Sequence, residues 1–502
     1  MSDPESKIVR TSNTTKIIQI KCSEKGKKVT VPTSIMWFRQ DLRVKDNPAL
    51  NAACDMGKIV PIYIYDDNAP DGRLPGGASQ WWLHHSLESL NKRLNGHLQI
   101  FKGDPQTIIP GLMKTFDATS IFWNRCYEPW QINRDKALKK HLIDEGFEAH
   151  SCNGSLLWEP MKVLKKDGTP YRVFTPYYKN GCLQVEEPRY PKAPPARITY
   201  ADVKSEGDQL ASLALLPSIK WDETIAKEWS PGEDGAADNL SDFIENSARK
   251  YKDGRDIPSA RGTSRLSPHL HFGEVSPNQV WYAIKDKFGN SEDKSIETYL
   301  SELGWREFSY YLLFHFPTLP NKNFNDKFDK FPWRTDAKAL KAWQQGKTGI
   351  PIVDAGMREL WQTGYMHNRI RMVVGSFLVK NLLLDWHEGE RWFWDTLLDA
   401  DLASNSAGWQ WVAGSGADAA PYFRVFNPVL QGEKFDKKGT YVRKYCPELN
   451  GLSDKYIHKP WEAPSAILKD AGIELGKHYP KPIVDLKASR QRALDAFQEI
   501  KE

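Results

Sequence analysis

Paired cysteines and metal-ligand motifs are missing from this sequence. Its 502 residues include only six cysteines, and none of them has a CxxC or other metal-ligand spacing. So few cysteines without a pattern are typical of proteins that keep free thiols in a reducing compartment. We therefore expect no metal site. We also expect a cytoplasmic protein if the source is bacterial, and a nuclear or organellar one only if it is eukaryotic.

Membrane-spanning and nucleotide-binding patterns are missing as well. No apolar run approaches the length that spans a bilayer. No GxGxxG follows the first expected strand and no GxxxxGK(S/T) occurs, so the usual α/β sites for nucleotide phosphates have no support. No Ser/His/Asp arrangement supports a hydrolase. The net charge of +5 does not by itself indicate nucleic acid, although positive charge can gather on one face.

Tryptophan is the residue type present in excess. The chain has 19 tryptophans, and many of them fall between Trp305 and Trp411. Two interpretations are open. The indoles either fill a large core with some rings at its rim, or some of them stack on a planar ligand or relay electrons.

Short apolar runs alternate with helical patterns in the first third of the chain. This alternation predicts βαβ units and a parallel sheet. We therefore expect a doubly wound α/β domain over residues 34–165, preceded by a disordered extension at 1–33 that is rich in Ser, Thr and Lys. The expected strands lie at 34–38, 59–65, 98–101 and 120–123, with helices between them that include 78–95 and 105–116.

The rest of the chain divides into a connection and a helical domain. Residues 166–235 are rich in Pro, Lys and Gly and have little periodicity, which is typical of a linker that runs over the surface. From 236 to 502 the pattern is helical, so we expect a mainly α-helical second domain. Its expected helices include 294–315, 336–346, 351–362, 365–385 and 388–398.

Two segments of the helical domain combine groups that suit a bound ligand. Residues 262–268 (GTSRLSP) offer hydroxyls, a guanidinium and successive N–H groups that suit a pyrophosphate, and an ordinary helix-capping loop is the alternative. On a helix, Glu302, Trp305, Arg306 and Ser309 share one face. That face suits a pocket that both stacks and hydrogen-bonds, and a surface ion pair is the alternative.

Two further segments have the same character. In the helix that contains 366–372, Asn368, Arg371 and Met372 lie opposite the apolar stripe. This placement suits a ligand surface, and a helix buried on two sides is the alternative. Residues 399–411 carry two acids, an amide and two indoles among small residues, which indicates a polar and aromatic pocket wall.

Taken together, these motifs resemble the photolyase/cryptochrome family. The matching segments are WFRQDLR (37–43), WREF (305–308), TGYMHNRIRM (363–372), WQW (409–411), DAAPYFRVFNP (418–428) and QGEKFD (431–436). The resemblance implies an antenna-binding α/β domain and a helical domain that binds FAD and DNA. It also implies light-dependent repair of cyclobutane pyrimidine dimers, in which photoexcited reduced FAD donates one electron to a dimer flipped out of the duplex.

Two other activities in this family are the alternatives, a blue-light receptor of the cryptochrome type and a photolyase for (6-4) lesions. Plant sensory cryptochromes usually carry an acid at the position of Asn405 and lack the pocket tryptophan within WREF. Enzymes for (6-4) lesions offer a histidine pair, and His367 has no such partner in the sequence. Both differences favour dimer repair.

The resemblance also implies which residues hold FAD. Asn405 is expected to face flavin N5 and to act in catalysis, because an amide tolerates the reduced anion that a carboxylate would repel. Arg371 and Asp399 are expected to form an ion pair beside the isoalloxazine, and Asp401 to hydrogen-bond the flavin. The other implied cofactor-binding residues are Tyr251, Thr263, Ser264, Arg265, Leu266, Ser267 and Arg306.

Electron transfer and lesion binding are assigned by the same resemblance. Trp409, Trp386 and Trp333 are expected to relay electrons, in this order from the flavin to the surface. Glu302 is the implied catalytic carboxylate that stabilises the dimer radical anion. Trp305 and Trp411 are expected to cradle the dimer, and the pocket is completed by Asn368, Arg369 and Met372.

Within the family, residues 304–310 and the pair Trp81-Trp82 look closer to bacterial class III photolyases than to class I. The expected antenna is methenyltetrahydrofolate, stacked on Trp81 and bonded by Glu128, with 8-hydroxydeazaflavin as the alternative. Ser404 and Ser406 depart from the commoner asparagines, which we expect to alter radical stability without abolishing repair. The expected partner is UV-damaged DNA, bound by a monomer without a membrane or a metal.

Overall fold

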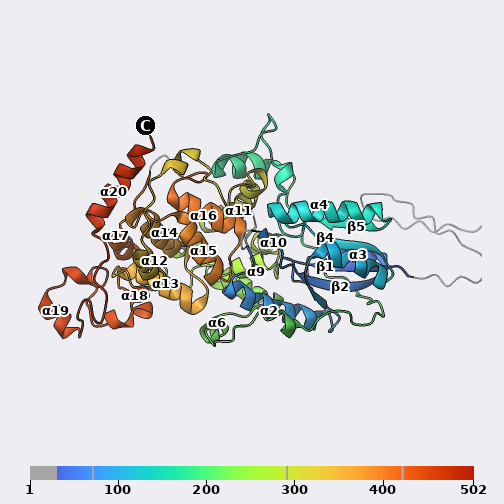
Figure 1. Cartoon of the computed structure of the whole chain (residues 1–502), viewed down its shortest axis with the longest axis horizontal. Helices are drawn as coiled ribbons and strands as arrows, with labels where there is room; N and C mark the ends of the chain where they lie inside the picture. The colour runs from blue at the N-terminus through green and yellow to red at the C-terminus, as the bar shows by residue number, and fades with distance from the viewer. Residues whose placement is uncertain (1–30, 71–72, 290–291, 420–422, 502) are drawn as a thin grey trace, which may run out of the picture.

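The computed structural model describes residues 31–70, 73–289, 292–419 and 423–501. A region built on a sheet lies beside a larger, mainly helical region (Figure 1). The extension predicted at 1–33 lies almost wholly outside the described residues, and Thr33 already begins the first strand.

Five parallel strands form the sheet, in the order β3-β2-β1-β4-β5. The central strand β1 pairs on both sides, so that Trp37 lies opposite Ile62 and Trp123. The strands are β1 (Thr33–Phe38), β2 (Lys58–Tyr65), β3 (Gln99–Lys102), β4 (Ala118–Asn124) and β5 (Glu148–Cys152). β5 was not predicted, because it is an edge strand whose sequence EAHSC has little apolar character.

Helices cover both faces of the sheet. α1 (Pro48–Met56) and α2 (Gly77–Arg93) share a hydrophobic cluster with Met36, whereas α3 (Pro105–Thr115) and α4 (Pro129–Asp144) share another with Trp37. Successive residues of β1 thus enter two separate cores, which explains why its sequence is continuously apolar. The predicted doubly wound α/β fold is confirmed.

The second region is helical, as predicted. Its longest helix, α11 (Lys294–His315), packs against α8 (Tyr251–Gly254), α10 (Pro277–Phe288) and α16 (Leu402–Ala413). The other helices of this region are α7 (Glu233–Asn246), α9 (Ser267–His271), α12 (Ala337–Gln344), α13 (Pro351–Thr363), α14 (Asn368–Ser376), α15 (Trp386–Thr396), α17 (Pro428–Phe435), α18 (Thr440–Tyr445), α19 (Ser465–Asp470) and α20 (Leu486–Glu499).

The predicted single helix at 365–385 is wrong in its extent. α14 begins only after His367, whose side chain accepts a hydrogen bond from the backbone N–H of Arg369 and caps the helix. It then passes into a π-helical turn, Phe377–Asn381, and Leu383 has a positive φ of 56° that ends the helical path. The predicted apolar stripe is nevertheless buried.

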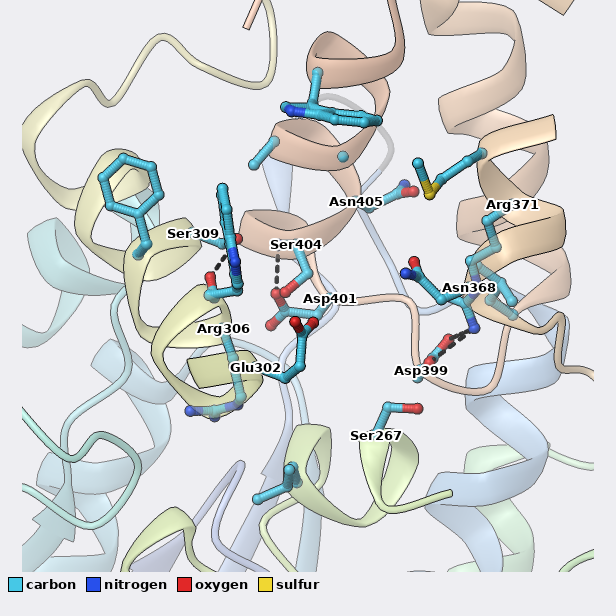
Figure 2. A pocket seen from close by; sticks show the side chains of 18 of the residues that line it. Ser267, Glu302, Arg306, Ser309, Asn368, Arg371, Asp399, Asp401, Ser404 and Asn405 are labelled. Atoms are coloured by element: carbon cyan, nitrogen blue, oxygen red, sulfur yellow. Dashed lines mark hydrogen bonds and ion pairs between the residues drawn. The ribbon is translucent and has the colours of Figure 1, made fainter. Parts of the chain in front are cut away.

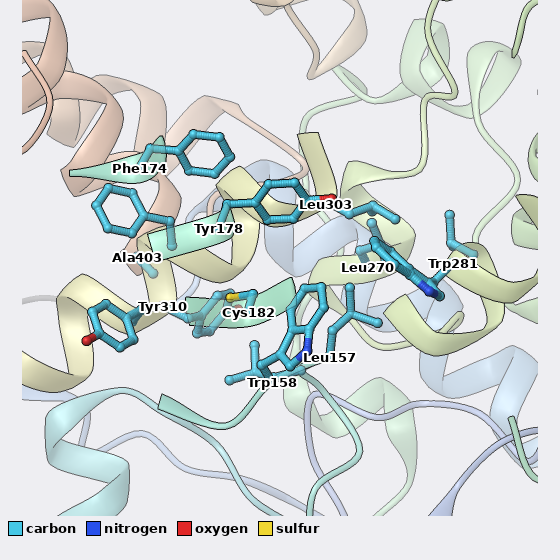
Figure 3. Close-up of a cluster of buried hydrophobic side chains, with 14 of the residues drawn as sticks. Leu157, Trp158, Phe174, Tyr178, Cys182, Leu270, Trp281, Leu303, Tyr310 and Ala403 are labelled. Carbon is cyan, nitrogen blue, oxygen red and sulfur yellow. The ribbon is translucent and has the colours of Figure 1, made fainter. Parts of the chain in front are cut away.

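The segment 166–235 differs from the expected surface linker. α5 (Phe174–Pro176) and the π-helical turn Tyr177–Gly181 insert aromatic rings into the core beside α11, and Figure 3 shows Phe174 and Tyr178 there. Gly304 permits this approach, because a Cβ atom on it would lie 2.6 Å from the Tyr178 ring. A second short helix, α6 (Glu223–Glu228), also belongs to this segment. Isolated aromatic anchors of this kind leave no periodic pattern in a sequence.

Candidate active site

A cavity of about 630 Å³ opens in the helical region between α9, α11, α14 and α16 (Figure 2). Sixteen of the residues implied by the sequence line it together: Tyr251, Ser264, Leu266, Ser267, Glu302, Trp305, Arg306, Asn368, Arg369, Arg371, Met372, Asp399, Asp401, Asn405, Trp409 and Trp411. The structure thus joins segments that lie far apart in the sequence. The roles given to these residues by the resemblance stay predictions.

One wall of the cavity is the predicted face of α11. Glu302, Trp305, Arg306 and Ser309 all line the cavity, one or two helical turns apart. The Glu302 carboxylate pairs with Arg255 at 2.5 Å, which holds the carboxylate beside the Trp305 indole. A fixed carboxylate next to an open indole face can hydrogen-bond the edge of a stacked aromatic ligand.

The facing wall comes from α14 and the loop before α16. Arg371 Nη2 lies 3.0 Å from both carboxylate oxygens of Asp399, and its Nε donates to the carbonyl of Met366 at 2.7 Å. The predicted ion pair is therefore present. Its guanidinium is held in place from two sides, which leaves a locally neutral, rigid pair at the cavity wall.

Asp401 caps the N-terminus of α16 and remains charged. Its carboxylate accepts hydrogen bonds from the Ser404 N–H at 2.7 Å and from the Tyr310 hydroxyl, and His271 lies 3.7 Å away. Burial alone would raise the pKa of Asp401, but the nearby His271 and the hydrogen bonds from Tyr310 and Ser404 lower it to about 2. The carboxylate is thus an acceptor at any physiological pH.

Asn405 follows one turn later on α16. Its Nδ2 donates to the backbone carbonyl of Glu390 at 3.1 Å and to the Glu390 carboxylate at 3.2 Å. Glu390 in turn pairs with Arg73 of the sheet-containing region. Because the amide nitrogen is engaged by Glu390, the amide oxygen is the group available to a ligand in the cavity.

Two predicted cofactor residues do not line the cavity. The guanidinium of Arg265 lies over the Trp229 ring, 4.2 Å from its centroid, and pairs with Glu228 at 3.6 Å. Arg265 also has a left-handed backbone with φ of 53°, which turns its side chain differently from its neighbours. The Thr263 hydroxyl lies 3.5 Å from that of Tyr365. The structure gives these two residues no direct part in the cavity wall.

The three relay tryptophans belong to or pack against one hydrophobic cluster beside the cavity. Trp409 lines the cavity and is 4% exposed, and Trp386 is fully buried in the same hydrophobic cluster. Trp333 packs against that cluster and is only half-buried. The order of these tryptophans from the flavin to the surface and electron transfer along them stay predictions.

The two residues that were predicted to bind the antenna pigment are both buried. The Trp81 indole is 2% exposed, with the rings of Trp82 and His85 edge-on against it, so it has no open face for a stacked pigment. Glu128 is also buried and accepts a hydrogen bond from the Trp130 indole at 2.7 Å. Stacking on Trp81 is therefore contradicted, because protein atoms already cover the ring.

Sequence reasoning missed several residues of the site. Arg255, which holds Glu302, and His271, which faces Asp401, both line the cavity. Each stands four residues after a residue that was identified, Tyr251 and Ser267 respectively. That spacing was a usable signal. The buried partners Tyr310 and Glu390 stand at the same spacing after Arg306 and Trp386.

Comparisons with known proteins identify the chain's relatives. The sequence model of the DNA photolyase family matches residues 34–196, and that of the FAD binding domain of DNA photolyase matches residues 299–499. A deoxyribodipyrimidine photo-lyase of Agrobacterium fabrum is 51% identical over 93% of this chain and 98% of its own length. The chain belongs to the photolyase/cryptochrome family. Its helical region is this family's FAD-binding domain.

Both branches of the family are among the relatives. Cryptochrome-2 of Arabidopsis thaliana is 39% identical over 93% of this chain and 79% of its own length. Among solved structures, a bacterial class III photolyase from Agrobacterium tumefaciens superposes with a TM-score of 0.91 at 50% identity, covering 95% of this chain and all of that one. Family membership alone therefore does not separate repair from signalling.

The cavity fits FAD. Its volume lies within the roughly 300–1,000 Å³ that is usual for cofactor sites. The Ser264 and Ser267 hydroxyls supply donors for phosphate oxygens at the side of α9, and Asn405 supplies an amide at α16. A Cβ atom on Gly408 would meet nothing within 4 Å, so the wall leaves open space there.

Other binding features outside the cavity are few. Among the described residues, no helix is long and apolar enough to cross a membrane. The described part of the chain contains one group with metal-ligand spacing, in which the ligand atoms of His84, His85 and Glu88 lie within 4.8 Å of one another. His85 and Glu88 form an ordinary i,i+3 pair at 3.3 Å on α2, which accounts for their proximity without a metal.

Proposed function

We propose that this protein repairs cyclobutane pyrimidine dimers in DNA, as a light-dependent lyase that uses FAD. The observation that carries the proposal is the joint placement of Trp305 and Trp411 in the wall of one cavity with Asn405 and Glu302. Two indoles beside a flavin-sized space suit a pair of fused pyrimidines flipped out of the duplex. The identity to a named deoxyribodipyrimidine photo-lyase supports the same lesion.

The cavity residues would hold FAD, which in its reduced form would supply light-driven one-electron chemistry to the lesion. The protein supplies position and electrostatics. The Arg371–Asp399 pair and the charged Asp401 fix the shape and charge of the cofactor side, and Asn405 offers a neutral acceptor there. Glu302, held by Arg255, would accept hydrogen bonds from the N–H edge of the lesion and so fix its position in the cavity.

A blue-light receptor is the second candidate function, because cryptochromes are among the relatives. The neutral amide of Asn405 and the complete pair of cavity indoles favour repair. Repair of (6-4) lesions has less support. His367 is 3% exposed and does not line the cavity, and burial lowers its pKa to about 4.

The test is a repair assay on purified protein with fully reduced flavin. A thymine-dimer oligonucleotide is incubated under blue light or in the dark, and restored thymine is quantified. We expect restoration in light only. Absence of repair in light, with flavin bound and reduced, would defeat the proposal and favour the receptor. A matched oligonucleotide with a (6-4) lesion should remain unrepaired.

The antenna and the cellular setting are part of the same proposal. We propose methenyltetrahydrofolate in the α/β domain in preference to 8-hydroxydeazaflavin, at a site other than the face of Trp81. The two pigments differ in absorption maximum, so a spectrum of the purified protein decides between them. We propose that the protein is a photolyase of class III type that acts as a monomer in the cytoplasm of a bacterial cell. Its substrate is DNA with an extruded dimer.

A further inference from the structure

One face of the Trp305 indole is stacked against a second aromatic ring. The rings of Trp305 and Phe174 lie parallel, with centroids 3.8 Å apart and planes inclined by 10°. Phe174 is itself 6% exposed and anchored in the core shown in Figure 3. One face of the indole is therefore covered by protein, and the other is left to the cavity. The orientation of the open face follows from a residue outside the cavity wall.

The Trp411 indole is fixed by a hydrogen bond. Its Nε1 donates to the backbone carbonyl of Asp418 at 3.2 Å. Asp418 has φ of 56°, a left-handed conformation that is uncommon for residues other than glycine and is tolerated best by Asn and Asp. A sharp backbone turn thus brings its carbonyl to the indole.

Asp418 connects the two indoles. The backbone N–H of Phe174 faces its carboxylate and opposes the rise that burial causes in the carboxyl pKa, while its carbonyl accepts a hydrogen bond from Trp411. The chain of contacts therefore runs from Trp305 through the Phe174 ring and backbone to Asp418 and then to Trp411. Neither Phe174 nor Asp418 lines the cavity.

We propose that Phe174 and Asp418 are positioning residues that set the orientation of the two indoles for a pyrimidine dimer. This inference rests on the proposed function. Two indole planes can both stack on a rigid, fused pair of bases only if the distance and angle between the planes match the bases. Small displacements of the indoles therefore lower the affinity for the dimer. The two residues reach the site from the connecting segment and from the loop after α16, so both must be in place before the grip is complete.

Substitutions of Asp418 test the connection. Asp418→Asn keeps a side-chain oxygen beside the Phe174 N–H and tolerates the left-handed backbone, whereas Asp418→Gly tolerates the backbone but lacks the oxygen. In a dark fluorescence-polarisation titration of the holoprotein, we expect Asp418→Gly to bind a dimer-containing duplex about three- to tenfold more weakly, because the polar contact with Phe174 is lost. Asp418→Asn should bind as the unsubstituted protein does.

Substitution of Phe174 tests the stacked ring. Phe174→Leu keeps an apolar side chain but removes the plane, and we expect the affinity for the dimer to fall about two- to tenfold. Phe116→Leu is the matched control, because Phe116 is as buried as Phe174 but lies in the core of the sheet, away from the cavity. In both series, flavin content and affinity for undamaged duplex should not change. A general loss of structure would lower both.

The outcomes separate this inference from the proposed function. Unsubstituted protein that neither binds nor repairs dimers defeats both. Unsubstituted protein that repairs, with Asp418→Gly and Phe174→Leu both retaining its preference for damaged over undamaged DNA, overturns the inference alone. An equal loss in Asp418→Asn and Asp418→Gly overturns the role of the contact between the Asp418 side chain and Phe174. If Phe174→Leu does not fold, the Asp418 pair still decides.

Discussion

The carboxyl end of the sheet and the cavity of the helical domain both collect charged and amide side chains, but these groups are used differently. At the sheet, Asn124 donates to Asp41 at 2.6 Å and to Asn47 at 2.7 Å, and Asn47 also donates to Asp41 at 3.1 Å. Arg43 donates only to backbone carbonyls there. Most of these groups satisfy one another, as buried polar groups do in a structural network, although Asn124 Oδ1 has no partner among the described residues.

In the cavity, each of these polar groups is hydrogen-bonded or ion-paired to another residue and still faces the cavity. Glu390 holds the nitrogen of Asn405, Arg255 holds Glu302, and Tyr310 holds Asp401, while all three held groups still line the cavity. The difference indicates that the network at the sheet stabilises the fold, whereas the polar groups of the cavity are available to bind a ligand. Changes in the first should lower stability and spare binding, and changes in the second should affect binding.

The largest effect on stability is expected at Asp41. Asp41→Ala removes the acceptor of three hydrogen bonds in a buried network, so the free energy of unfolding should fall by about 3 kcal/mol. Denaturant unfolding followed by tryptophan fluorescence measures this. Flavin per folded protein should not change. The control is Asp55→Ala on the exposed side of α1, with little effect. Lost flavin at unchanged stability would contradict the comparison.

The next effect is on lesion binding. Trp305→Ala removes one stacking plane, so affinity for a dimer-containing duplex should fall by about 1–3 kcal/mol, or about 5- to 150-fold. A gel-shift titration measures it, with flavin content as the check on folding. Trp361→Ala is the control, because Trp361 is 58% exposed and lies outside the cavity wall. Equal affinities for both variants would show that the cavity is not the lesion site.

A smaller, pH-dependent effect is expected at Asp401. The pKa of Asp401 is held at about 2, below its ordinary value of 3.8. The charged carboxylate therefore stabilises the fold above about pH 4, and this contribution is lost as the pH falls toward 2. Asp401→Asn should lower the free energy of unfolding by about 2 kcal/mol at pH 7. Thermal melts between pH 7 and pH 3 should show the gap narrowing below pH 4. A gap independent of pH would contradict the assignment.

The smallest effect on stability and repair is expected at Trp409. Trp409→Phe keeps an aromatic ring in the core but removes the indole nearest the cavity. We expect photoreduction of the bound flavin to slow at least about tenfold, because it depends on that indole. Repair by chemically reduced protein should stay near normal. Trp343→Phe is the control, since Trp343 is equally buried and its ring lies 6.2 Å from that of Trp409. Equal photoreduction in both would remove Trp409 from the relay.

The sequence predicted most of the wall that lies on regular helices. The face of α11 and the polar side of α14 follow from helical periodicity, and the sheet follows from alternating apolar runs. The errors have physical causes. Arg265 turned away because of its left-handed backbone and the Trp229 ring, and Trp81 proved buried. Phe174 was hidden in an aperiodic segment whose burial depends on Gly304 and on contacts distant in sequence.

The most direct test of the account compares light-driven repair in the unsubstituted protein and in the double variant Trp305→Ala, Trp411→Ala, both with reduced flavin bound. We predict that the unsubstituted protein restores thymine from a dimer-containing oligonucleotide in blue light. The double variant should retain its flavin but repair at less than about a tenth of that rate, since both stacking planes are lost. Equal repair by the two proteins would contradict the claim that the lesion lies between these indoles.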